Sequence, residues 1–215
     1  MVENILYIVA GYLIGSVPFG YIAGKLNGID LREHGSRNIG ATNAVRVLGK
    51  AWGIPVFFMD FLKGFVPLLC MKCHLGGDLS AFSPEDMGWF LGMMFALILG
   101  HTFTCFLKFK GGKGVATTGG CLFALSPWVG LSALLFWIGS MIVTRYVSFS
   151  SIMAGVGMIA AAAVELTVVD GSCSVADGMV LGLLAIILIL VTVKHRANIV
   201  RIMNGTEPKA FAPKN

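Results

Sequence analysis

Apolar residues gather into long runs along this chain of 215 residues, and short polar segments separate the runs. A helix that crosses a bilayer needs about 20 mainly apolar residues. The runs that we expect to form such helices cover residues 4–26, 51–71, 88–107, 115–125, 127–144, 151–169 and 176–193. Ser126-Pro127 separates the fourth run from the fifth, because proline disfavours helix in the residue before it. The pattern predicts an all-α polytopic membrane protein with seven transmembrane helices in a single domain, residues 1–215; the count falls to five if the short pieces are re-entrant or interfacial.

The composition supports lipid as the solvent. Hydrophobic residues make up 56% of the chain and charged residues only 13%, whereas a soluble domain carries about 25% charged residues. The first run lacks a basic leader and a cleavage site, so we expect a retained helix and not a signal peptide. Cys70-x-x-Cys73 has no second ligand pair to complete a zinc set, so we expect no metal and no cofactor.

Basic residues are distributed unevenly over the predicted loops. Loops of one side hold fourteen of the 16 lysines and arginines: Lys25, Arg32, Arg37, Arg46, Lys50, Lys108, Lys110, Lys113, Arg145, Lys194, Arg196, Arg201, Lys209 and Lys214. Cytoplasmic loops of membrane proteins carry the excess of lysine and arginine. The sequence therefore predicts an N-terminus outside and a C-terminus in the cytoplasm, which agrees with an odd number of spans.

The segment Lys110-Gly111-Gly112-Lys113-Gly114 lies on this basic side. Glycines let a backbone approach a phosphate closely, lysines add charge, and the N-terminus of a following helix favours anions. The segment is not a Walker loop, which requires Ser or Thr where Gly114 stands. Taken alone, it fits a phosphate site and a basic turn that only obeys topology equally well.

Three more polar segments are predicted on the same face, and all are rich in hydrogen-bond donors. The first offers Ser36, Asn38, Asn43 and Arg46; the second offers Ser148 and Ser151; the third offers His195, Asn198 and Arg201, one every three residues. Donors with few carboxylates suit an anionic partner, and phosphate is the obvious one. Solvated loops and a basic terminus remain the plainer interpretation of each segment alone.

Three ionisable residues fall inside or at the end of predicted spans. Asp60 and Lys63 lie one turn apart, where charges are costly and usually pair or line a cavity. His101 has no acidic residue five positions later, where one large class of glycerol-phosphate acyltransferases places its aspartate. His101 is therefore a candidate both for a buried hydrogen-bonding role and for a catalytic role.

Taken in order, these motifs resemble the PlsY family, the bacterial acyl-phosphate:glycerol-3-phosphate acyltransferases. The matching stretches are Gly15-Ser-Val-Pro-Phe-Gly20, Ser36-x-Asn-Ile-Gly-Ala-Thr-Asn43 with Arg46, Asp60-x-x-Lys63-Gly64, Gly100-His-x-Phe-x-x-Phe-Leu-x-Phe-Lys-Gly-Gly-Lys-Gly-Val-Ala-Thr117, Thr144-Arg-Tyr-Val-Ser148-x-x-Ser151, His195-x-x-Asn198-Ile-x-Arg201 and Gly205-Thr-Glu207. They cover nearly the whole chain. Arg37 departs from the pattern, because a small residue, commonly glycine, is expected there.

The resemblance implies a seven-helix enzyme of the bacterial cytoplasmic membrane whose site faces the cytoplasm. It would transfer a fatty acyl group from acyl phosphate to the 1-hydroxyl of glycerol 3-phosphate, giving lysophosphatidic acid and inorganic phosphate for phospholipid synthesis. Its partners would be these two substrates, membrane lipid and the enzyme that makes acyl phosphate, with no nucleic acid.

The resemblance also implies roles for residues. Lys113, Ser36 and Arg46 would bind phosphate and stabilise developing charge as catalytic residues. The expected substrate-binding residues are Asn38, Asn43, Lys110, Gly111, Gly112, Ser148, Ser151, His195 and Asn198, and further candidates are His101, Asp60 and Lys63. Three rivals stand beside this hypothesis: a membrane transporter of phosphate or another anion, a scaffold for lipid enzymes, and an acyltransferase that uses acyl-CoA.

Overall fold

The structure, a computed structural model, describes residues 1–166 and 174–210. Every regular element in these two ranges is a helix, which confirms the predicted all-α class. Contacts divide the chain into two compact units, Met1–Leu125 and Ser126–Asn215. The single domain over residues 1–215 stays a prediction.

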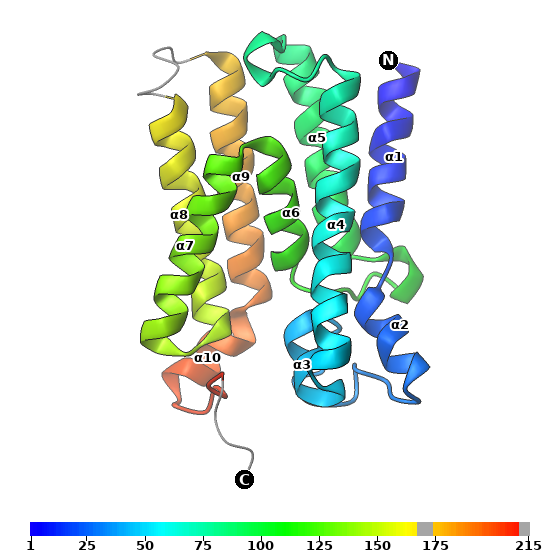
Figure 1. The fold of residues 1–215 in the computed structure, drawn as a ribbon, viewed down its shortest axis with the longest axis vertical. Helices are drawn as coiled ribbons and strands as arrows, with labels where there is room; N and C mark the ends of the chain where they lie inside the picture. Colours follow the sequence, from blue (N-terminus) through cyan, green and yellow to red (C-terminus); the bar gives the residue numbers. More distant parts are fainter. Residues whose placement is uncertain (167–173, 211–215) are drawn as a thin grey trace. The chain divides into compact units, whose positions relative to one another are not determined.

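The first unit is built around three long helices that run side by side (Figure 1). Its elements are α1 (Val2–Ser16), α2 (Phe19–Leu26), α3 (Ala41–Leu48), α4 (Lys50–His74), η1 (Leu79–Ala81), α5 (Pro84–Thr102), η2 (Cys105–Leu107) and α6 (Val115–Leu125). The main pairings are α1 with α5 and α4 with α6. The short α2 and α3 and the segment between α5 and α6 lie toward the end of the unit away from the N-terminus, so two of the predicted polar segments share one end of this unit.

Six helical segments of the described chain are long and apolar enough to cross a membrane. They are Val2–Leu26, Lys50–His74, Pro84–Leu107, Pro127–Thr144, Val147–Val164 and Val175–Lys194. The remaining predicted span forms only α6, whose 11 residues rise about 16 Å at 1.5 Å per residue. This is about half of the 30 Å hydrocarbon core, so six full-length candidates and one short helix replace the expected seven spans.

The prediction of one continuous helix over residues 4–26 is wrong in detail. Pro18 lacks an N–H and cannot continue the hydrogen-bond ladder, so α1 ends at Ser16 and α2 begins at Phe19. The carbonyls freed by the break find donors elsewhere: the Thr104 hydroxyl donates to Ser16 O at 2.6 Å, and Lys63 Nζ donates to Val17 O at 2.8 Å. The break is therefore tied to α4 and to the segment that follows α5.

Glycines set the close approach of the paired helices in the first unit. A Cβ added at Gly15 would overlap the backbone of Leu97 on α5, and one added at Gly100 would overlap α1. Between α4 and α6, a Cβ at Gly64 or at Gly120 would overlap the facing helix backbone in the same way. Small residues allow such contacts in membrane helices. The end of α5 and the start of α6 are thereby fixed on either side of the glycine–lysine segment.

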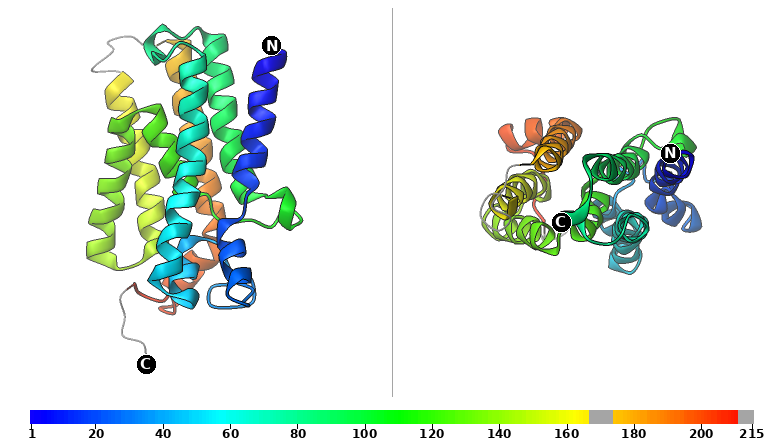
Figure 2. Two further views of the ribbon diagram at one scale, coloured as in Figure 1. Left: turned by 45° about the vertical axis from the view of Figure 1, so that its right-hand side comes forward. Right: turned by 90° about the horizontal axis from the view of Figure 1, so that it is seen from above.

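The second unit contains α7 (Pro127–Thr144), α8 (Val147–Val164), α9 (Val175–Lys194) and α10 (Arg196–Met203), also seen in Figure 2. The predicted bounds of α7 are confirmed, since Pro127 starts the helix and the Ser126 hydroxyl accepts from Val129 N. α8 begins four residues earlier than expected. Its predicted end at residue 169 lies outside the described residues.

Candidate functional site

The glycine–lysine segment, residues 110–114, lies against the C-terminal end of α5. Gly111 N donates to Thr102 O at 3.2 Å, and Gly112 N donates to His101 O at 2.9 Å. A Cβ at Gly111 would overlap these carbonyls, and a Cβ at Gly112 would fall on His101 Nε2. Glycine is required at both positions because α5 occupies the space of a side chain. The two amides bond α5 in this structure, and the expected role of this backbone in binding phosphate stays a prediction.

Lys113 and the N-terminal turn of α6 are the parts of this segment that carry positive charge suited to an anion. Gly114 adopts φ +82°, a left-handed conformation suited to glycine, and the chain enters α6 at Val115. The first turn of α6 contains no acidic residue, and a helix N-terminus carries a partial positive charge. Lys113 is half-buried directly before this turn, whereas Lys110 is exposed. The arrangement combines a cation with helix N–H groups, which is chemistry that binds phosphate.

Asn43 organises the polar segment between α2 and α3. Its side chain is buried, and its Nδ2 lies within hydrogen-bond distance of Leu31 O, His34 O and Asn38 O, at 2.8 to 3.1 Å. Its Oδ1 accepts from Ser36 N at 2.8 Å. Both ends of this amide therefore bond the loop backbone, and the expected substrate-binding role of Asn43 stays a prediction. Asn38 is likewise engaged, since its Oδ1 accepts from Gly40 N.

Ser36 and Arg46 keep their side chains exposed on this organised segment. Ser36 is held through its backbone by Asn43, and Arg46 lies in the last turn of α3. Neighbouring cations are less available: Asp30 pairs with Arg32 at 2.6 Å and with Lys25 at 3.5 Å. The hydrogen bond from Arg32 holds the pKa of the Asp30 carboxyl well below its ordinary value. Ser36 and Arg46 thus remain good candidates for an anion.

Arg37 stands at a strained position of the same loop. Its φ is +57°, in the left-handed region where a residue with a Cβ is disfavoured and glycine is not. This explains why the resemblance leads one to expect a glycine here.

Asp60 and Lys63 form the internal pair that the sequence suggested. Lys63 Nζ lies 2.8 Å from Asp60 Oδ1, and both side chains are buried within α4. His101 Nδ1 approaches the same carboxylate oxygen at 3.5 Å. His101 is itself only 6% exposed and is covered by Gly112, so it fits the buried hydrogen-bonding role and not direct contact with a substrate.

A polar cluster in the second unit centres on Glu207, a residue to which the sequence assigned no role. Ser148 Oγ and Asn198 Nδ2 donate to its Oε1 at 2.9 and 2.7 Å, and Arg201 Nε donates to its Oε2 at 2.7 Å. Burial raises the pKa of the Glu207 carboxyl, but hydrogen bonds from Asn198, Arg201 and Ser148 outweigh burial and hold it below its ordinary value. The sequence feature that could have pointed to this cluster is Glu207 itself, an acidic residue within a basic C-terminal tail.

His195 and Ser151 are fixed by their own helices. His195 Nδ1 lies 2.8 Å from Val191 O, where α9 meets α10, and the ring is buried. Ser151 Oγ donates to Val147 O at 2.8 Å. The structure thus describes predicted residues in two polar clusters, one within each unit. The expectation that both serve one pocket stays a prediction.

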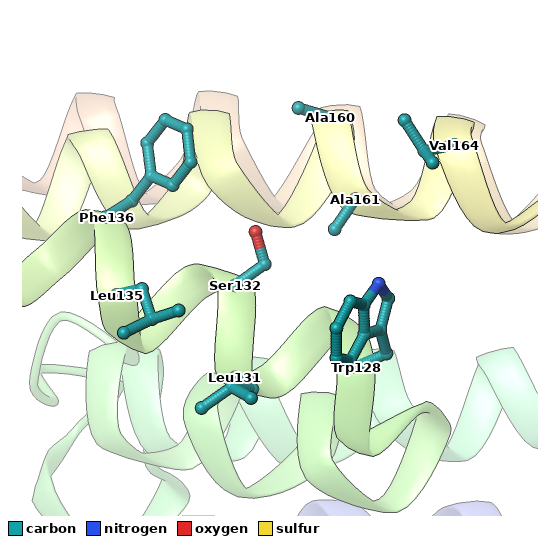
Figure 3. Close-up of a pocket in the computed structure, with 8 residues that line it drawn as sticks. All are labelled: Trp128, Leu131, Ser132, Leu135, Phe136, Ala160, Ala161 and Val164. Atoms are coloured by element: carbon teal, nitrogen blue, oxygen red, sulfur yellow. The ribbon is translucent and has the colours of Figure 1, made fainter.

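A cavity of about 340 Å³ lies between α7 and α8 (Figure 3). Its lining is formed by Trp128, Leu131, Ser132, Leu135, Phe136, Ala160, Ala161 and Val164. Ser132 contributes a hydroxyl group to this lining, and that hydroxyl donates to Gly157 O at 3.2 Å. This lining suits an apolar chain and offers no charge to a phosphate.

Known proteins resemble this chain over almost its whole length. The family described as Glycerol-3-phosphate acyltransferase matches residues 5–205. A relative of that name from Aquifex aeolicus (strain VF5) is 41% identical over 205 residues, which are 95% of this chain and 98% of the relative. Another, from Synechocystis sp. (strain ATCC 27184 / PCC 6803 / Kazusa), is 43% identical over 202 residues, 92% of this chain and 86% of the relative.

Solved structures give the same result. A crystal structure of PlsY, an integral membrane glycerol 3-phosphate acyltransferase, in its glycerol 3-phosphate form has a TM-score of 0.82 and 40% identity, and covers 96% of this chain and 95% of that chain. The lysophosphatidic acid form has a TM-score of 0.80, 39% identity and the same coverage. This chain belongs to the glycerol-3-phosphate acyltransferase family.

Proposed function

We propose that this protein transfers a fatty acyl group from acyl phosphate to the 1-hydroxyl of glycerol 3-phosphate. The hydroxyl oxygen attacks the acyl carbonyl carbon, an ester C–O bond forms, and the C–O bond to the phosphate leaving group breaks. The hydroxyl proton is balanced by the departing phosphate, which is released as hydrogen phosphate. The products are lysophosphatidic acid and inorganic phosphate.

The observation that carries this proposal is the match to PlsY in its glycerol 3-phosphate form over 96% of the chain. The second PlsY structure is described as its lysophosphatidic acid form, which is the product expected from this reaction. Acyl phosphate as the donor agrees with membership of this family.

The electrostatics of the first unit support the same chemistry. Both substrates carry a phosphate, and their negative charges repel one another when they meet. Lys113, Arg46 and the N-terminus of α6 supply positive charge to offset this repulsion. Acyl phosphate is an activated mixed anhydride, so positioning and charge stabilisation can provide most of the catalysis.

We assign the following roles to residues of the first unit, as the family resemblance implies. Lys113, Ser36 and Arg46 act as catalytic residues that contact phosphate and stabilise charge in the transition state. Lys110, which is exposed on the loop, adds positive charge for binding the substrate phosphate. Gly111 and Gly112 act through the backbone fit to α5 described above.

The second unit supplies substrate-binding residues under the same proposal. Ser148 and Asn198 are held in place by Glu207, and Ser151 and His195 by their own helices. Loss of kcat/KM in variants of both units would support this division. If only variants of the first unit lost kcat/KM, the substrate-binding residues would be confined to that unit.

We further propose an N-terminus outside, a C-terminus in the cytoplasm and a site that faces the cytoplasm of a bacterial inner membrane. Lys113 precedes α6 and Arg145 follows α7, and basic loops face the cytoplasm. Under this proposal the chain between Lys113 and Arg145 begins and ends in the cytoplasm. An odd number of crossings gives this orientation, whereas six full crossings would place both termini on one side.

The test is an assay of purified protein with labelled glycerol 3-phosphate and either palmitoyl phosphate or palmitoyl-CoA. The proposal requires lysophosphatidic acid and equimolar inorganic phosphate from palmitoyl phosphate. Product from palmitoyl-CoA alone would overturn the choice of donor. Phosphate flux into empty liposomes without any product would instead establish the transporter.

A further inference from the structure

A chain of buried contacts links the interior of α4 to the glycine–lysine segment. Lys63 Nζ contacts Asp60 Oδ1 at 2.8 Å, and the same oxygen lies 3.5 Å from His101 Nδ1 on α5. The opposite nitrogen of the ring, Nε2, lies where a Cβ of Gly112 would be. Asp60 is thus separated from the loop by one imidazole ring.

Lys63 ties the same carboxylate to the helix break near the start of the chain. Its Nζ donates to Val17 O at 2.8 Å and lies 5.5 Å from the centroid of the Phe19 ring. Asp60 and Lys63 are only 2% and 5% exposed. The pair therefore joins α4, the α1–α2 break and the end of α5 at one buried point.

Burial of such a pair is a poor source of stability. The cost of removing two charges from water can exceed their attraction, and apolar residues of similar volume often serve a fold equally well. Charged residues inside a membrane segment are accordingly a sign of function. Direct contact with substrate does not account for this pair, because Gly112 covers the His101 ring and His101 separates Asp60 from the loop.

We propose that Asp60 is a positioning residue that acts through His101 to hold the loop before Lys113. The carboxylate fixes the orientation of the imidazole, and the imidazole packs against Gly112. The His101 and Thr102 carbonyls hold the two glycine amides at 2.9 and 3.2 Å. Lys113, the next residue, is thereby set for phosphate. This inference rests on the proposed acyl transfer for its kinetic consequence, but the loop contacts can be measured without turnover.

The test uses two readouts on the same purified variants. Asp60→Asn/Lys63→Met removes both buried charges together, so that no unpaired ion is left to unfold the protein. His101→Leu removes the ring nitrogens. We expect each variant to lose at least about tenfold in kcat/KM for glycerol 3-phosphate, because a displacement of about 1 Å near the reacting groups can cost about 100-fold. The triple variant combines Asp60→Asn, Lys63→Met and His101→Leu. We expect its loss in kcat/KM to be little greater than that of either variant, since both changes interrupt one chain of contacts.

Hydrogen exchange of residues 108–114 gives the second readout. Exchange at Gly111 and Gly112 should be faster in both variants than in the wild type. Gly11→Ala is the control for general destabilisation, because its Cβ would overlap Met93 between α1 and α5 without touching the loop; it should leave loop exchange unchanged.

Folded variants with wild-type kcat/KM and wild-type loop exchange would overturn the inference, as would losses that multiply in the triple variant. A wild type that forms no lysophosphatidic acid would overturn the proposed function alone. Hydrogen exchange of residues 108–114 would then decide whether Asp60 positions the loop.

Discussion

Replacement of Glu207 by glutamine should destabilise the second unit, and the structure sets the magnitude. Glu207 accepts three hydrogen bonds, from Ser148, Asn198 and Arg201. Glutamine has a similar shape, and its one oxygen can still accept from Ser148 and Asn198. Bonds to a neutral acceptor are about half as strong as those to a carboxylate, which costs about 1 kcal/mol here. The remaining NH₂ faces Arg201, so the ion pair is also lost.

The ion pair contributes modestly, because the Arg201 side chain is 38% exposed and partly exposed pairs contribute about 0.5–1 kcal/mol. The sum is about 2 kcal/mol. For a chain of this length, that lowers the thermal midpoint by about 4–8 °C. The assay is thermal unfolding of purified protein in detergent, with Glu33→Gln as the matched exposed control. A Glu207→Gln midpoint equal to that of the control would refute the structural role of the cluster.

The pH dependence of unfolding gives a second check on the same residue. The folded-state pKa of Glu207 lies below its ordinary value near 4.5. A lowered carboxyl pKa adds stability that is present above the unfolded-state pKa and disappears as the pH falls through the folded-state pKa. Wild-type stability should therefore fall below about pH 4.5 by more than that of Glu207→Gln. Parallel curves for the two proteins would show that Glu207 is not linked to folding.

Three further substitutions test other parts of the structure. Arg37→Gly should raise the thermal midpoint by the equivalent of about 1 kcal/mol, because the position adopts φ +57°; an unchanged midpoint would count against strain there. Asn43→Ala should lower the midpoint by the equivalent of at least 2 kcal/mol, because buried loop carbonyls and an amide lose their partner; wild-type stability would contradict that role. Gly120→Leu should disrupt the pairing of α4 and α6, because a Cβ would overlap Phe61 O, and normal folding by size-exclusion chromatography would contradict the close contact.

The sequence predicted the helices well where long apolar runs end at polar segments. Ser126-Pro127 located the start of α7, and the bounds of α7 and α9 follow from the apolar pattern. The break at Pro18 was missed because the apolar run continues through it, and its freed carbonyls are satisfied by Thr104 and Lys63, which are distant in sequence. Hydropathy reports burial in lipid but not where a backbone ladder is interrupted.

The contacts of individual polar side chains could not be predicted from their segments. Asn43 and Gly112 look like ligand contacts in a linear motif, but the fold uses Asn43 to bond its own loop and Gly112 to make room for His101. Glu207 appears in the sequence as one acidic residue in a basic tail, and its three donors come from α8 and α10. Such pairings depend on contacts between distant segments, which spacing along the chain does not report.

The rate of lysophosphatidic acid formation by Lys113→Ala tests the central claim most directly. Purified wild type, Lys113→Ala and the control Lys108→Ala, an exposed lysine of the same loop, would be assayed with palmitoyl phosphate and labelled glycerol 3-phosphate. Loss of one preorganised donor to a charged transition state costs about 100- to 1,000-fold in rate. We predict a loss of that size for Lys113→Ala and near wild-type turnover for Lys108→Ala. A folded Lys113→Ala protein that turns over at the wild-type rate would contradict the account.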